Sequence, residues 1–96
     1  MMTLEILKAK RNAIMQLAQQ WGAYNIRIFG SVARGDAGPN SDVDFLVTFE
    51  PNRSLFDHGG LLTDLQNLLN CKVDVMSEKG MRQRLRDHVF KDAVPL

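Results

Sequence analysis

The chain has 96 residues, of which 45% are hydrophobic and 24% are charged, and its formal net charge is +1. These values are typical of one small globular domain, and the near-neutral charge provides no field that would attract nucleic acid or an anionic membrane. Cys71 is the only cysteine, which excludes an internal disulfide, and we expect its thiol to be a buried packing group. No apolar run approaches the roughly 18 residues that span a bilayer, and the N-terminus lacks a signal-peptide pattern. We therefore expect a cytoplasmic protein in which residues 1–96 form a single domain.

The first half of the chain predicts a helix followed by a short strand. Apolar residues at helical spacing indicate a helix over residues 3–21, with Thr3 as its N-cap and Gly22 as its stop. The next segments are a strand, a turn or single helical turn, and a loop, over residues 25–29, 30–35 and 36–41.

The second half predicts four further elements. They are a strand, a helix, a strand and a terminal helix, over residues 43–49, 54–69, 72–76 and 81–92. Gly59 and Gly60 weaken the helix over 54–69, which either continues through them or is broken or kinked there. In the terminal helix, the residues expected to face the core are Met81, Leu85 and Val89, with Phe90 as a further candidate. The order of elements is typical of a small three-stranded α/β domain, whose sheet is too small to cover both of its faces, so some apolar surface remains for a partner.

A pair of carboxylates begins the strand over 43–49. Side chains alternate along a strand, so Asp42 and Asp44 share one face while Val43 and Phe45 point into the core. Two carboxylates about 4 Å apart repel each other by about 4 kcal/mol at an effective dielectric constant of about 20, unless a proton or a cation lies between them. The spacing therefore indicates a cation site.

Asp74 is the third candidate carboxylate, because it lies in the middle of an apolar strand. If that strand lies beside the strand over 43–49, Asp74 joins Asp42 and Asp44. Oxygen ligands suit Mg²⁺ or Mn²⁺, and such a cluster holds two ions about 3.5–4 Å apart that clamp an in-line displacement. Zinc is not expected, because the histidines and Cys71 lack ligand spacing. The alternative is a set of surface carboxylates that cap turns.

The Gly30-Ser31 turn supplies the second half of the pattern. Its backbone N–H groups and the Ser31 hydroxyl are suited to hold the β- and γ-phosphates of a nucleoside triphosphate. Arg34 either reaches the same phosphates or ties the loop to an acidic residue, and Gly35 is expected at a positive φ. Ser41 is a further nucleotide-binding candidate, although a hydrogen bond that closes the loop is the simpler interpretation.

Other conspicuous residues have a simpler structural interpretation. We expect Trp21 and Tyr24 to pack rather than to stack on a base or contact a partner, and the same alternatives stay open for Phe56. We expect His58 to be an exposed loop residue. A basic run near the terminal helix is either a solvated face, a phosphate-neutralising group or a contact for an acidic partner; it contains Lys79, Arg82, Arg84 and Arg86.

The full motif resembles a known family. The chain resembles the nucleotidyltransferase superfamily of DNA polymerase β, and more narrowly the minimal nucleotidyltransferases (MNT proteins) of bacteria and archaea. The resemblance lies in Gly30-Ser31-x-Ala33-Arg34-Gly35, followed by Ser41-Asp42-x-Asp44 and then by Asp74. The resemblance implies a small α/β nucleotidyltransferase core like the polymerase β palm, with a three-stranded mixed sheet flanked by helices. It also implies that Gly30 and Ser31 bind phosphate and that Asp42, Asp44 and Asp74 bind metal and act in catalysis.

The resemblance implies a function as well. Minimal members are commonly the antitoxins of HEPN-domain toxins, and some transfer AMP from ATP to a tyrosine of the toxin. Our leading hypothesis is therefore Mg²⁺-dependent AMP transfer from ATP to a protein hydroxyl, with the acceptor supplied by another molecule in a homo- or hetero-oligomer. The alternatives are a catalytically idle antitoxin that neutralises its toxin by binding, or nucleotidyl transfer to a small molecule or an RNA end. We expect neither a membrane nor a nucleic-acid partner.

Overall fold

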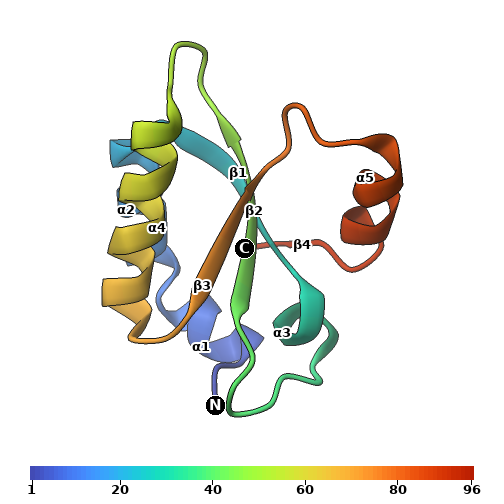
Figure 1. Ribbon diagram of the computed structural model, residues 1–96. Helices are drawn as coiled ribbons and strands as arrows, with labels where there is room; N and C mark the ends of the chain where they lie inside the picture. The colour runs from blue at the N-terminus through green and yellow to red at the C-terminus, as the bar shows by residue number, and fades with distance from the viewer.

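The centre of the structure is a mixed four-stranded sheet in the order β3-β2-β1-β4 (Figure 1). The computed structural model describes residues 1–96. The strands are β1 (Ala23–Phe29), β2 (Val43–Phe49), β3 (Val73–Ser77) and β4 (Val94–Pro95). β1 pairs antiparallel with both β2 and β4, whereas β2 pairs parallel with β3. The expected α/β class is confirmed.

The expectation of three strands is wrong, because β4 is a fourth. β4 has two residues, and its register places Val94 beside Ile28. The next residue holds the strand in place, since the Leu96 N–H donates to the Ile26 carbonyl at 3.1 Å. Pro95 lacks an N–H group and is tolerated because β4 is an edge strand. Two residues that include a proline carry no strand pattern, so the sequence did not indicate β4.

The helix expected over residues 3–21 is two helices, α1 (Leu4–Ala9) and α2 (Arg11–Gln20). Its predicted N-cap is confirmed, because the Thr3 hydroxyl accepts from the Ile6 N–H at 3.2 Å. The break lies at Lys10, whose N–H is shared between the carbonyls of Ile6 and Leu7. Such sharing tightens the last turn of a helix and ends it.

α4 (Leu55–Leu69) connects the parallel strands β2 and β3, and it runs without interruption through Gly59 and Gly60. Ser54 and Asp57 form a capping box at its start. His58 lies in this helix and is half-buried, so the expected exposed loop position is wrong. The helix continues through its glycines because its apolar face is covered by the sheet and by α2.

The main core lies between the sheet and the helices α2 and α4, on the left in Figure 1. Val43, Phe45 and Val47 of β2 are fully buried there, which confirms the predicted alternation. On the opposite side of the sheet, Figure 1 shows α3 (Gly30–Arg34) and α5 (Gln83–Phe90). Val89 of α5 is buried as expected, whereas Leu85 is 42% exposed and does not face the core. None of the helices combines the length and the hydropathy that crossing a bilayer requires.

Candidate functional site

The Gly30-Ser31 turn lies directly against Asp44. β1 ends at Phe29, which is paired with Asp44 across the sheet, and α3 begins at Gly30 with a φ of +73°. A Cβ atom at position 30 would overlap the Asp44 carboxylate. Glycine is therefore required here twice, for the backbone conformation and for the close approach. Ser31, the next residue, lies in the first turn of α3.

The sheet brings Asp44 and Asp74 together. The parallel register of β2 and β3 makes these two residues direct partners, and neighbouring strands lie about 4.8 Å apart. Asp42 precedes β2 by one residue and therefore lies at the same end of the strand pair. The register therefore confirms that the strand of Asp74 lies beside that of Asp44, whereas a site formed by all three carboxylates stays a prediction.

The charges of these carboxylates interact. Burial, followed by the nearby carboxylates of Asp74 and Asp42, raises the pKa of Asp44 from 3.8 to about 6, whereas Arg34 opposes the shift. No three histidine, cysteine or acidic side chains converge closely enough to enclose a metal ion in this structure. The donor set nevertheless suits a hard divalent cation, because it consists of carboxylate oxygens whose mutual repulsion a cation would relieve.

Arg34 is held by two acidic residues. Its Nε lies 3.2 Å from the Asp36 carboxylate and its guanidinium lies 2.9 Å from that of Asp92, which follows α5. Both hydrogen bonds raise the pKa of Arg34, that to Asp92 more than that to Asp36. The structure therefore shows the loop-tying arrangement, one of the two roles expected for this residue. Gly35 has the expected positive φ, +82°.

Ser41 closes the loop that separates the turn from the carboxylates. Its hydroxyl accepts from the Gly38 N–H at 2.8 Å, and its own N–H donates to the Gly38 carbonyl at 3.2 Å. Cys71 is half-buried beside this end of the sheet. Burial and then the Asp42 carboxylate raise the pKa of its thiol, so it is protonated and unreactive at neutral pH.

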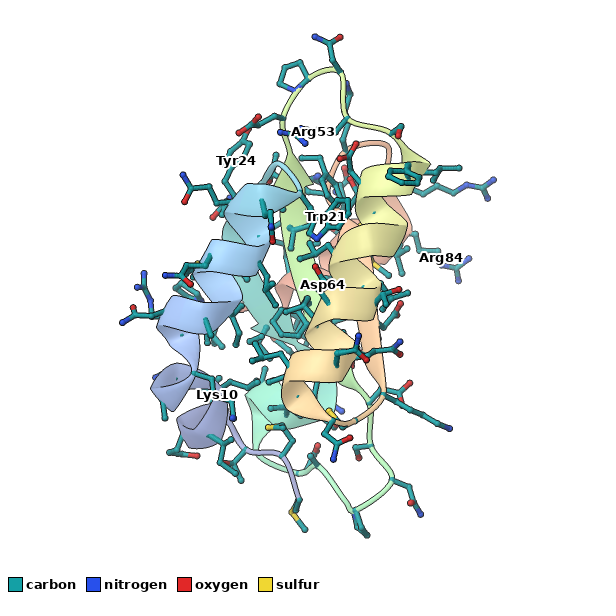
Figure 2. All side chains as sticks on the ribbon, turned by 90° about the vertical axis from the view of Figure 1, so that its left-hand side faces the viewer. Lys10, Trp21, Tyr24, Arg53, Asp64 and Arg84 are labelled. Carbon is teal, nitrogen blue, oxygen red and sulfur yellow. The ribbon has the colours of Figure 1, made fainter.

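The indole of Trp21 fills the space between α2 and α4, as expected of a packing residue (Figure 2). Its Nε1 donates to Asp64 of α4 at 2.7 Å, and its ring lies over Gly60. The expectation for Tyr24 is wrong, because its side chain is 51% exposed. Phe56, whose role the sequence left open, is 80% exposed. The Phe56 ring contacts Trp21 only edge-on, at 6.2 Å between centroids.

His58 contacts the edge of the sheet. Its Nε2 donates to the Val75 carbonyl at 2.7 Å, and its ring lies 5.5 Å from that of Phe49. The bond covers part of β3, which is an edge strand of the sheet. The residue is therefore structural, and it lies outside the carboxylate group.

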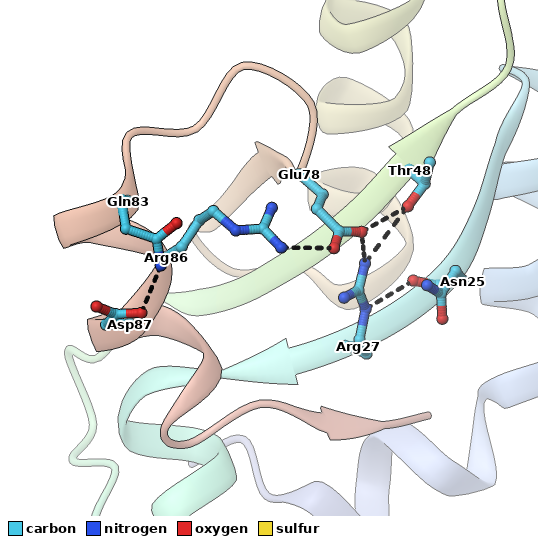
Figure 3. Close-up of polar contacts among 7 residues, drawn as sticks. All are labelled: Asn25, Arg27, Thr48, Glu78, Gln83, Arg86 and Asp87. Atoms are coloured by element: carbon cyan, nitrogen blue, oxygen red, sulfur yellow. Dashed lines mark hydrogen bonds and ion pairs between the residues drawn. The ribbon is translucent and has the colours of Figure 1, made fainter.

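Sequence analysis missed a buried ion pair. Arg27 on β1 is 9% exposed, and its guanidinium lies 3.0 Å from Glu78, which also accepts from Thr48 and pairs with Arg86 at 3.6 Å (Figure 3). Phe90 of α5 lies under both guanidinium groups, 5.4 Å from that of Arg27 and 4.9 Å from that of Arg86. The available signal was a charged residue between isoleucines in a strand, which needs a buried partner. This network joins β1, β2 and α5.

Comparison with known proteins extends these observations. The model of the family described as the nucleotidyltransferase domain matches residues 10–96. Protein adenylyltransferase MntA of Thermococcus cleftensis is 34% identical over 95 residues, which make up 98% of this chain and 96% of that protein. A protein of Methanocaldococcus jannaschii with a provisional name as a protein adenylyltransferase is 34% identical over 91 residues, 95% of this chain and 97% of its own.

Solved structures agree with this assignment. One that is provisionally described as a minimal nucleotidyltransferase has a TM-score of 0.87 and 48% identity, over 99% of this chain and 97% of that chain. A toxin–antitoxin structure with AMP-PNP has a TM-score of 0.76 at 23% identity, over 88% of this chain and 69% of that one, and shares the fold. A Shewanella oneidensis complex of a tri-AMPylated HEPN toxin with its MNT antitoxin also shares the fold. Its TM-score is 0.70 at 19% identity, over 92% of this chain and 69% of that chain. The chain therefore belongs to the nucleotidyltransferase domain family and is a minimal nucleotidyltransferase related to the MntA protein adenylyltransferases.

Proposed function

We propose that this protein transfers AMP from ATP to a hydroxyl group of a partner protein, a tyrosine of a HEPN toxin, and thereby acts as its antitoxin. The observation that carries the proposal is the contact of the Gly30 turn with Asp44, combined with the pairing of Asp44 and Asp74. In this proposal the turn binds the phosphate chain on which the neighbouring carboxylates act. Support for a protein acceptor comes from the relative named protein adenylyltransferase MntA and from the shared fold of the antitoxin bound to an AMPylated HEPN toxin.

The bonds that change are defined by the reaction. The acceptor oxygen forms a bond to the α-phosphorus of ATP, and the bond from that phosphorus to the bridging oxygen breaks, which releases pyrophosphate. The backbone N–H and hydroxyl of Ser31 hold the β- and γ-phosphates, and Gly30 allows them to approach Asp44. Asp74 takes the proton of the attacking hydroxyl. Arg34 and Ser41 lie at the ends of the loop beside the turn, and we assign them to nucleotide binding once ATP competes for their present partners.

We further propose that Asp42, Asp44 and Asp74 bind Mg²⁺, as two ions, with Mn²⁺ as a substitute. Asp44 supports this proposal, because it is half-buried beside two like charges and a bound cation would relieve the repulsion among them. When bound, the ions lower the pKa of the acceptor hydroxyl and stabilise the departing pyrophosphate.

The test combines the protein with ATP labelled at the α-phosphate, Mg²⁺ and the cognate HEPN protein. Label should appear on the HEPN protein with the wild type and with Asp64→Asn, a control that keeps an acceptor for Trp21. Asp44→Asn and Asp74→Asn should abolish the label. Absence of label with the wild type contradicts the proposal, and toxin neutralisation that survives Asp44→Asn favours the steric alternative.

A further inference from the structure

The outward side of α5 carries a cationic surface that the proposed reaction does not use. Arg82, Arg84, Leu85 and His88, together called the α5 outer face, surround a surface depression of about 460 Å³. All four residues are exposed. Leu85 is the apolar member, so the face combines positive charge with an exposed leucine.

The charges of this face have no counterions within the chain. Arg82 and Arg84 take part in none of the ion pairs of the structure, whereas their neighbour Arg86 pairs with Glu78 on the inward side. The side chain of Arg84 extends outward from the molecule (Figure 2). The carboxylate of Asp87 lies on the same helix and accepts from Gln83 at 2.8 Å (Figure 3). The two arginines are therefore free to pair with another molecule.

The helix that carries this face is fixed relative to the carboxylates. Asp92, two residues after the end of α5, pairs at 2.9 Å with Arg34, which lies in the turn that follows Gly30. At the inward side of α5, Arg86 pairs with Glu78, and Phe90 packs against the guanidinium of Arg27. A molecule bound to the α5 outer face is thus held at a defined position relative to Asp44 and the phosphate-binding turn.

We propose that the α5 outer face is the docking surface for an acidic patch of the acceptor protein. Unpaired guanidinium groups select a partner by its negative charge, and they accelerate its approach. Arginine is enriched among the residues that dominate binding between proteins, and Leu85 adds an apolar contact beside the two arginines, which favours a folded protein as the partner. The inference rests on the proposed function only in taking the acceptor to be a protein.

The test compares two variants with the same change of charge. Arg82→Glu/Arg84→Glu reverses the α5 outer face, and Lys8→Glu/Lys10→Glu reverses two exposed lysines at α1 as a control. Binding of the cognate HEPN protein is measured by calorimetry without ATP, and AMP transfer is measured against HEPN concentration. Circular dichroism and thermal unfolding show whether each variant is folded.

We expect the α5 variant to weaken the Kd and to raise the KM for the HEPN protein by about tenfold or more, with kcat retained and the control unchanged. Arg82→Lys/Arg84→Lys, which keeps both positive charges, should retain most of the wild-type binding of the HEPN protein. Added salt should weaken that binding more in the wild type than in the α5 variant. An unchanged Kd in the α5 variant overturns the inference even if AMP transfer occurs. Binding that depends on this face without AMP transfer supports the inference and overturns the proposed reaction. If the face instead binds fluorescein-labelled single-stranded RNA and the HEPN affinity is unchanged, the inference is also overturned.

Discussion

Gly30 and Asp44 approach so closely that the glycine could not carry a methyl group without displacing the carboxylate. Gly30→Ala should therefore reduce AMP transfer by about a hundredfold, because it moves both the turn that we propose to bind phosphate and the carboxylate that we propose to bind metal. Gly35→Ala is the matched control, since Gly35 also has a positive φ but has nothing within 4 Å of the added carbon.

Both substitutions strain the backbone by about 1–2 kcal/mol, so thermal unfolding should register each of them. The transfer assay should separate them, with Gly35→Ala keeping most of the activity. Equal activity losses in the two variants would show that backbone strain, and not the contact with Asp44, is responsible.

The raised pKa of Asp44 predicts how metal-free stability depends on pH. The group binds its proton more tightly in the folded state, with a pKa of about 6 against 3.8 unfolded. Its contribution to stability is therefore fully present below pH 3.8 and is lost as the pH rises through about 6. Asp44→Asn should accordingly be more stable than the wild type at neutral pH, by about 1 kcal/mol after solvent screening of this partly exposed group, and the advantage should shrink in acid.

Urea unfolding in EDTA at several pH values measures this difference. Glu5→Gln removes an exposed carboxylate from α1 and serves as the control. A wild type that is more stable than Asp44→Asn at neutral pH without metal would contradict the electrostatic description of the site.

Added Mg²⁺ should make the wild type more stable than Asp44→Asn, which reverses the order of stability expected in EDTA. A ligand that binds only the folded state at about a hundred times its Kd adds about 2.7 kcal/mol of stability. We expect this gain in the wild type and its loss in Asp44→Asn and Asp74→Asn, measured as a shift of Tm with Mg²⁺ concentration. A shift that survives in both variants would place the bound ion elsewhere.

The two adjacent glycines of α4 should respond oppositely to alanine. Gly59 faces open space, so Gly59→Ala should stabilise the helix by about 0.5–1 kcal/mol. A Cβ at Gly60 would lie 2.5 Å from the Trp21 ring, so Gly60→Ala should destabilise the protein by about 1–3 kcal/mol. Urea unfolding measures both, and stabilisation by both substitutions would show that Trp21 can move without cost.

The ion pair of Glu78 predicts a loss of stability in acid. The hydrogen bond from Arg27 and then that from Thr48 lower the pKa of Glu78, against the opposing effect of burial. This contribution is present above the unfolded pKa and is lost as the pH falls through the lower folded value. Glu78→Gln should therefore lower Tm at neutral pH, and the difference from the wild type should vanish in acid. A difference that is independent of pH would assign the effect to packing.

Local patterns were sufficient to predict the faces of the strands. Alternation along β2 correctly separated the buried Val43 and Phe45 from Asp44, because the hydrophobic pattern determines which side of a strand meets the core. The N-cap at Thr3 was likewise predictable, because capping depends on a few neighbouring residues.

Longer-range features depend on partners that no local pattern reveals. The sharing of the Lys10 N–H breaks a helix whose sequence contains neither glycine nor proline at that point. Arg34 and Asp92 are 58 residues apart, so their ion pair follows from the tertiary structure that brings the residues after α5 to the end of α3. The pairing of Asp44 with Asp74 could be predicted only if their strands are neighbours, and the order of the strands is set by the tertiary structure.

The parallel pairing of β2 with β3 has a consequence for biosynthesis. Asp44 and Asp74 become neighbours only after α4 has folded and returned the chain to the sheet, and contacts of such sequence separation form late. A nascent chain that has emerged only to the end of α4 contains the whole Gly30 to Asp44 motif but lacks its third carboxylate. Asp74 therefore reaches Asp44 only when β3 pairs with β2, so translation products that end before β3 should not transfer AMP if Asp74 acts as proposed.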